Sequence, residues 1–195
     1  MRKKYLMWQH VELWERDGMH IGHFRSARRA AAWADLVIVH MDVSVIHPKY
    51  IDALANHPCV LNRGVLDIRK SSTSECTLQR DSTWTGPVIV KSNLNREGRP
   101  ERMKGIAAGF KGSWWSRKES QYLEFSSLRA VPTWAWKGNS WVVERQELQR
   151  TGSGYATASA TFFGNEISAV TLHAPSTVVK GANSTRTERM KQVPE

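Results

Sequence analysis

The sequence is poor in cysteine and contains no long apolar run. Only Cys59 and Cys76 are cysteines among 195 residues, which excludes a disulfide-rich scaffold and a zinc-binding cysteine pattern. This usage suits a reducing compartment, so we expect a cytoplasmic protein. No stretch approaches the ~18 consecutive apolar residues that a membrane-spanning helix needs. Gln9 and His10 interrupt the apolar part of the basic N-terminus, so we expect neither a secretory signal nor a membrane partner.

The glycine signatures of common enzyme classes are missing as well. The sequence contains no P-loop, no dinucleotide-binding glycine set and no nucleophile elbow. It also shows no internal repeat and no low-complexity segment. The apolar content of 41% nevertheless predicts a folded chain with a substantial core. Function therefore has to be inferred from residues that are scattered along the chain.

Positive charge and tryptophan are the two excesses of the composition. The net charge is +10, and nine residues are tryptophans. Such a charge suits nucleic acid, an acidic membrane surface or a phosphate-bearing ligand, and it equally suits a solvated basic surface. Five tryptophans could stack on bases or, as large aromatics more often do, build the core. These are Trp114, Trp115, Trp134, Trp136 and Trp141. Composition leaves these interpretations open.

Hydrophobic spacing predicts alternating helices and strands, followed by a β-hairpin near the end of the chain. Helices are predicted over residues 5–17 and 48–56. Residues 26–34 could form a helical turn or a loop, and residues 67–71 a helix start or a turn. Strands are predicted over residues 36–39, 60–61, 88–90, 140–145, 155–163 and 166–173, with further candidates at 19–24 and 177–180. Gly164 and Asn165 suit the hairpin turn. The polar end of the chain is predicted to add no closing element. This order predicts an α/β fold that passes into α+β.

Polar residues follow two of the predicted strands. Lys91 stands where the strand 88–90 should end, beside the loop 92–98. Its ammonium could bind phosphate oxygens, or it could simply extend into water. His40 and Asp42 share one face of an earlier strand, with His47 nearby. They could contribute to a metal site, or form an ordinary hydrogen-bonded pair at the edge of a sheet.

Six short motifs occur in an order that carries a family resemblance. They are LVIVHMDVS (Leu36–Ser44), VLNRGVLDIRKS (Val60–Ser71), GPVIVKSNLNREGRPE (Gly86–Glu101), WVVER (Trp141–Arg145), TFFGNE (Thr161–Glu166) and VVKGAN (Val178–Asn183). In order and spacing this series resembles the ATP-grasp superfamily, in particular a poorly characterised ATP-grasp-like branch. The resemblance covers most of the chain, from about Leu36 onward.

The resemblance implies a small α/β pre-domain followed by an incomplete two-lobed nucleotide-binding region. The pre-domain would span residues 1–60 and the ATP-grasp-like region residues 61–195. Within that region, a first lobe at about 61–140 and a hinge at about 141–149 would precede a partial second lobe at 150–195. ATP-grasp proteins hold ATP between two α+β lobes of this kind, so we expect ATP as the ligand.

The same resemblance implies a set of binding residues. Lys70 and Lys91 stand at the positions of the family's two phosphate-contacting lysines. Glu144 belongs to the segment that resembles the hinge, whose backbone and acid read adenine. Lys180 and Asn183 fall in a segment that faces the phosphates or the substrate. Family members use magnesium and ATP to activate a carboxylate as an acyl phosphate, which an amine or a thiol then attacks.

Departures from the family pattern indicate a truncated or impaired ligase. The loop after Lys91 carries a single glycine, Gly98, where relatives have several. Ala158 stands where a basic residue is expected. The chain stops at Glu195, before the strand pair that supplies the family's magnesium ligands, so those ligands are missing from this chain. We therefore expect nucleotide binding with weakened or lost catalysis, and a carboxylate or peptide substrate that the sequence does not identify.

Two other functions stay open at this point. A nucleic-acid-binding module would use the basic surface and exposed tryptophans. A non-catalytic interaction domain would keep the fold but have a collapsed nucleotide cleft. Each makes a structural prediction: the first requires exposed aromatic rings beside basic side chains, and the second requires a nucleotide site that is closed.

Overall fold

The chain forms two compact units of mixed α/β structure. A computed structural model describes residues 6–103, 122–163, 166–179 and 185–192. The first unit comprises Met1–Ser74 and Asn93–Lys111, and the second comprises Glu75–Ser92 and Gly112–Glu195. Small sheets and short helices occur in the described residues of both units, which confirms the mixed α/β class. The predicted pre-domain and lobes stay predictions, because compactness alone does not test them.

The first unit contains two short parallel strands, in which Val37 of β1 pairs with Val60 of β2. Its helices and strands are α1 (Leu6–Arg16), α2 (Ala27–Trp33), β1 (Val37–Ile38), α3 (Pro48–Asp52), β2 (Val60–Leu61), α4 (Lys70–Thr73), the 3-10 helix η1 (Asn95–Gly98) and α5 (Arg99–Met103). Its core consists of Ala30, Val37, Val39, Val43, Ile46 and Leu54.

Local sequence explains where these helices begin and end. The hydroxyl of Ser26 accepts a hydrogen bond from the Arg29 N–H at 3.4 Å and so caps α2. Pro48 occupies the first turn of α3, where no helical partner is needed for its missing N–H. Gly18 has a φ of +86° just after α1, which glycine adopts without steric cost and which ends that helix as predicted.

A three-stranded antiparallel sheet organises part of the second unit. The order is β4–β3–β5, so β3 is the central strand. The strands are β3 (Val88–Ser92), β4 (Tyr122–Phe125) and β5 (Trp141–Arg145), and the 3-10 helices η3 (Leu128–Ala130) and η4 (Thr133–Trp136) connect β4 to β5. One sheet face packs Val88, Val90 and Val143 against Trp134 and other aromatic side chains. That apolar face is the core of this part of the unit.

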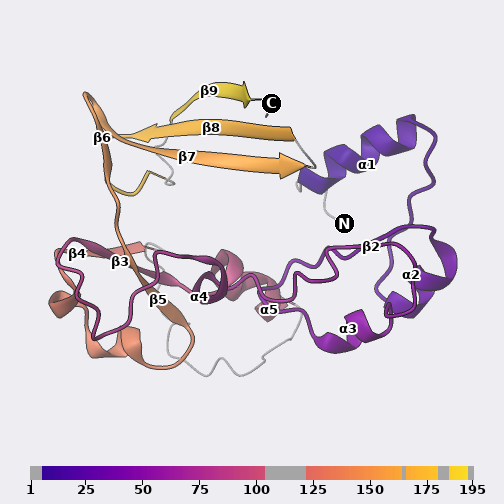
Figure 1. The fold of residues 1–195 in the computed structure, drawn as a ribbon, viewed down its shortest axis with the longest axis horizontal. Coiled ribbons are helices and arrows are strands. Elements are labelled where there is room, and N and C mark those ends of the chain that lie inside the picture. The colour runs from indigo at the N-terminus through magenta and orange to yellow at the C-terminus, as the bar shows by residue number, and fades with distance from the viewer. Residues whose placement is uncertain (1–5, 104–121, 164–165, 180–184, 193–195) are drawn as a thin grey trace. The chain divides into compact units, whose positions relative to one another are not determined.

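A four-stranded antiparallel sheet of order β6–β7–β8–β9 forms the rest of the second unit (Figure 1). The strands are β6 (Gln149–Thr151), β7 (Gly154–Phe163), β8 (Glu166–Ala174) and β9 (Thr185–Gln192). Tyr155 pairs with Ala174 and Phe163 with Glu166, which confirms the predicted antiparallel pair of strands. The predicted turn residues, Gly164 and Asn165, lie outside the described residues.

Three predictions about secondary structure are wrong. Residues 19–24 form no strand, and neither do residues 177–179. The polar residues 185–192 were expected to form no element, yet they form β9 and pair with β8. Strand β9 is an edge strand, whose backbone hydrogen bonds do not require apolar side chains, so hydrophobic patterning did not reveal it.

Candidate functional site

The alternation of side chains along β3 sends Lys91 to the polar face of its sheet. Val88 and Val90 point into the core, so Ile89 and Lys91 point to the opposite face. Lys91 lies opposite Val142 in β5, and Ile89 lies opposite Glu144. Residues directly opposite in an antiparallel pair share a face, so Lys91 and Glu144 are diagonal neighbours on the polar side. The sequence had placed Lys91 at the end of the strand, whereas in the structure Lys91 lies within β3.

An ion pair joins these two side chains. The Lys91 Nζ atom lies 2.5 Å from Glu144 Oε2, and the exposed fractions of the two side chains are 20% and 6%. The second carboxylate oxygen, Oε1, is buried and accepts no hydrogen bond from any residue that the structure describes. A buried acceptor without a donor is costly, so this oxygen is a strong candidate for a ligand donor.

The backbone of β5 holds Glu144 from both sides. β3 pairs along one edge, and residues 76–78 bind along the other. Leu78 donates its N–H to the Val143 carbonyl at 2.8 Å, and Arg145 donates to the Cys76 carbonyl at 2.8 Å. On the same face, the side-chain amide of Gln146 donates to the carboxylate of Glu124. The carboxylate of Glu144 is thus carried by a strand that is fixed on both edges.

Lys70 belongs to the first compact unit, at the start of α4. Its ammonium donates to the Leu94 carbonyl at 3.0 Å, and its N–H donates to the Asn93 carbonyl at 3.1 Å. Asn93 also receives the Ser71 N–H on its Oδ1 atom at 2.8 Å. These contacts bind α4 to the residues that directly follow β3 in the sequence.

An Asp–Arg pair fixes the residues that precede Lys70. The carboxylate of Asp67 accepts hydrogen bonds from the Arg69 guanidinium and from the Ser72 hydroxyl, the latter at 2.8 Å. The side-chain hydrogen bond from Arg69 is the largest of several effects that lower the pKa of Asp67 to about 2, while burial opposes the shift. The same contact raises the pKa of Arg69 above its usual value. Asp67 is therefore ionised at neutral pH, and its carboxylate holds Arg69 and Ser72 at the start of α4.

The structure brings together Lys91 and Glu144 of the five predicted binding residues. Lys70 is described within the other unit, and Lys180 and Asn183 lie outside the described residues. An ammonium beside an unsatisfied carboxylate oxygen suits a ligand that carries both phosphate and amino groups, as ATP does. Among the residues that the structure describes, no three His, Cys, Asp or Glu side chains form a group that could hold a metal ion.

His40 and Asp42 follow β1, as predicted, and Asp42 is part of a hydrogen-bonding network. Its Oδ1 atom accepts from the Asn95 amide at 3.3 Å, and its Oδ2 atom lies 3.6 Å from the Arg96 guanidinium. Asp42 therefore bonds to residues that follow β3 in the sequence, and the predicted hydrogen-bonded pair of His40 with Asp42 stays a prediction. Asn95 and Arg96 could not be identified as partners of Asp42 from the sequence, because no local pattern links residues more than fifty positions apart.

The tryptophans of the second unit that the structure describes belong to its core. Trp84, Trp134, Trp136 and Trp141 pack against the buried cluster of the β4–β3–β5 sheet. Trp134 and Trp141 meet edge to face, with ring centroids 5.3 Å apart. The alternative prediction, that Trp134, Trp136 and Trp141 build the core, is therefore confirmed. Trp114 and Trp115 lie outside the described residues.

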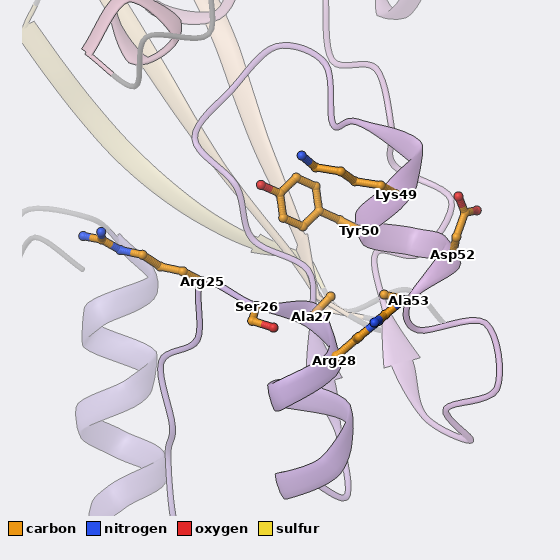
Figure 2. A pocket seen from close by; sticks show the side chains of 8 residues that line it. All are labelled: Arg25, Ser26, Ala27, Arg28, Lys49, Tyr50, Asp52 and Ala53. Atoms are coloured by element: carbon orange, nitrogen blue, oxygen red, sulfur yellow. The ribbon is translucent and has the colours of Figure 1, made fainter.

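A basic hollow lies in the first unit, between the start of α2 and α3 (Figure 2). Its volume is about 590 Å³, and its lining includes Arg25, Arg28, Lys49 and Tyr50. The Lys49 ammonium lies 5.2 Å from the centre of the Tyr50 ring. In Figure 2 the carboxylate of Asp52 points away from Lys49 and Tyr50. None of the three cations forms an ion pair among the salt bridges of the described residues.

Neither a membrane-spanning helix in the part of the chain that the structure describes nor a similar known protein helps to identify the function of this chain. Among the described residues, no helix has both the length and the apolar character that crossing a membrane requires. No protein-family model, curated protein or solved structure matches the chain.

Proposed function

We propose that the protein is an ATP-grasp-like nucleotide-binding protein that derives from a carboxylate-activating ligase. The observation that carries this proposal is the ion pair between partly exposed Lys91 and buried Glu144. Its ammonium is a partner for phosphate oxygens, and the unsatisfied Glu144 oxygen is an acceptor for the amino group of adenine. Both residues occupy the positions that the family resemblance assigns to nucleotide contacts.

The backbone of the loop after β3 also supports the proposal. Arg96, Glu97 and Gly98 have φ values of 45°, 59° and 68°. Such left-handed conformations are those that glycine adopts most readily. The segment thus keeps glycine-like geometry at positions where the family carries glycines, although two of the three residues are not glycine. This gives a physical reason to read the loop as a divergent version of the family's glycine-rich loop.

In the proposal, Lys91 exchanges its carboxylate partner for a phosphate group when a nucleotide binds. Lys91 is the more exposed member of the pair, so its ammonium is the group that can move. The nucleotide supplies the phosphoryl group for carboxylate activation in active family members. Nucleotide binding, with a phosphate contact to Lys91 and an adenine contact to Glu144, is therefore the part of the family activity that we propose for this chain.

The test is direct titration of the full chain with magnesium and a non-hydrolysable ATP analogue by isothermal calorimetry. We expect binding that Lys91→Met weakens by about tenfold or more, which corresponds to roughly 1.4 kcal/mol. Lys137→Ala is the matched control, because Lys137 is an exposed lysine of the same unit. Absence of binding at millimolar nucleotide, or equal affinity of the Lys91→Met variant, would refute the proposal.

The basic hollow favours nucleic-acid binding as a second candidate function. Arg25, Arg28 and Lys49 line one open cavity, and Tyr50 adds an aromatic ring. Phosphates and stacked bases are the natural partners of such a group. Labelled single-stranded oligonucleotides should then bind with an affinity that falls steeply with salt. The double change Arg28→Ala and Lys49→Ala should reduce that slope, whereas Arg129→Ala, which removes an exposed arginine of the other unit, should not.

A further inference from the structure

A second hollow lies in the first unit where the two parallel strands end. It has a volume of about 260 Å³, and residues that follow β1 and β2 form its walls. Its lining combines apolar and polar side chains, among them Val39, Leu66, Ile68, Asp42, Asn62 and Asn95. The carboxyl ends of parallel strands are a common place for ligands in open α/β sheets. The mixture of apolar walls and few polar groups is also typical of small-molecule sites.

Backbone hydrogen bonds hold the apolar walls in place. Ile46 donates its N–H to the Leu66 carbonyl at 2.7 Å, and Ile68 donates to the Ser44 carbonyl at 2.8 Å. Val39 donates to the Leu61 carbonyl at 3.1 Å, which extends the β1–β2 pairing to the rim of the hollow. The walls are therefore joined to one another, and a ligand would enter a site that is already formed.

A buried network fixes the polar side of the hollow. Ser44 is fully buried, and its hydroxyl accepts the Asn95 N–H at 2.7 Å. The Ser44 N–H donates to Glu101 Oε1 at 2.6 Å, and Glu101 is itself only 7% exposed. The Asn95 amide in turn donates to Asp42 at 3.3 Å. This network connects residues 57 positions apart in the sequence and sets where Asp42 and Asn95 stand.

The charge of the lining selects the kind of ligand. Asp42 is the carboxylate among the lining residues, which include one histidine, His40, but no lysine or arginine. The nearby Arg96 guanidinium lies 3.6 Å from Asp42, and the side chains of Arg96 and Asp42 are 53% and 21% exposed. Because Arg96 is largely in solvent and the contact is long, the pair contributes little, and Arg96 can give way to a ligand cation at Asp42. The lining thus complements a positive charge attached to an apolar body.

We propose that this hollow binds a small primary amine with an apolar body. The protonated amine donates to Asp42, and its hydrocarbon part lies against Leu66 and Ile68. Since a water occupies about 30 Å³ of the liquid, the volume suits a ligand of about ten non-hydrogen atoms or fewer. The site uses none of Lys70, Lys91 and Glu144. It therefore goes beyond the proposed nucleotide binding and does not depend on it.

The test compares two probes of nearly equal shape and opposite charge. Isopentylamine and isovalerate are titrated into the full chain, and backbone amide shifts are followed by NMR. We expect isopentylamine to shift the amides of residues 39–46, 62–68 and 95, and isovalerate to bind at least tenfold more weakly. Equal binding of the two probes, or no shift with either at tens of millimolar, would overturn the proposal.

Variants separate the proposed site from general effects of charge. Asp42→Asn should weaken isopentylamine binding about tenfold, whereas Asp35→Asn, which removes an exposed carboxylate of the same unit, should leave it unchanged. Because Asp42→Asn alters contacts to Asn95 and Arg96, Ile68→Lys provides a second variant at a partly exposed rim position. The added lysine repels the amine, and the apolar side chain that it replaces makes no hydrogen bond in that network. Retained amine affinity in both variants would rule out this site.

Discussion

The pair of Lys91 and Glu144 gives a prediction whose size can be worked out. At 2.5 Å and an effective dielectric constant of about 20, the direct attraction is roughly 7 kcal/mol. Desolvation of the two ions cancels much of that gain, so the net contribution of the pair is small. Removal of one partner is different, because the other charge then stays buried alone.

We expect Lys91→Met to lower the free energy of unfolding by about 3 kcal/mol, toward the lower end of the range for a broken buried pair. The lower end applies because Lys91 keeps 20% of its side-chain exposure. Glu144→Gln should cost about 1 to 2 kcal/mol, since Lys91 can then reach water. The double variant should cost less than the sum of the two single changes, because neither charge then remains unpaired.

Urea denaturation followed by circular dichroism measures these values, and the double-mutant cycle gives the coupling energy. We expect a coupling of about 2 kcal/mol, with little change on adding salt because the Glu144 carboxylate is buried. Unchanged slopes with urea would show that the unfolded state is unaffected. A coupling below about 0.5 kcal/mol would refute the argument, because independent sites add within that margin.

Three further predictions concern the backbone and pH. Gly154→Ala should cost about 2 kcal/mol or more, because its φ is +150° and an added Cβ would meet the Ala174 carbonyl oxygen at 2.4 Å. Gly152→Ala, where a Cβ meets nothing within 4 Å, should change stability by under about 0.5 kcal/mol in the same urea titration. Gly98→Ala should destabilise by about 1 kcal/mol, whereas Glu97→Gly should be neutral or stabilise by up to about 1 kcal/mol, and the opposite order would contradict the left-handed geometry. The lowered pKa of Asp67 means that its stabilising effect, on the order of 1 to 2 kcal/mol, is present above pH ~4 and is lost as pH falls toward 2. Asp67→Asn should flatten that part of the stability curve, and an unchanged acid limb would argue against the Arg69 contact.

Much of the fold could be predicted from short apolar runs. Val37–Ile38 and Val60–Leu61 were predicted as strands, and they form the parallel pair. The strands Val88–Ser92 and Trp141–Arg145 were predicted as well, although their pairing was not. Pairing depends on residues far apart in the chain, so local periodicity carries no information about it. For that reason the exact position of Lys91, inside a strand and facing Glu144, could not be deduced.

The candidate sites divide in the same way. Lys91 and Glu144 were each singled out from the sequence, but their direct contact was not foreseen. The network of Ser44, Asn95 and Glu101 could not be predicted from the sequence, because serine, asparagine and glutamate are common in surface loops. Only the fold shows that Ser44 and Glu101 are buried together. In this chain the residue types indicated which side chains could bind a ligand. Only the tertiary contacts showed which of those side chains lie close enough to form one site.

The way the chain passes between the two units constrains how the protein can be made and dissected. The first unit requires Asn93–Lys111 as well as Met1–Ser74, and Glu75–Ser92 of the other unit is inserted between these segments. During synthesis, β3 of the second unit is therefore made before Glu101, the residue that completes the Ser44 network of the first unit. No single cut yields either unit whole, so separate expression of the first unit would need residues 75–92 replaced by a short linker.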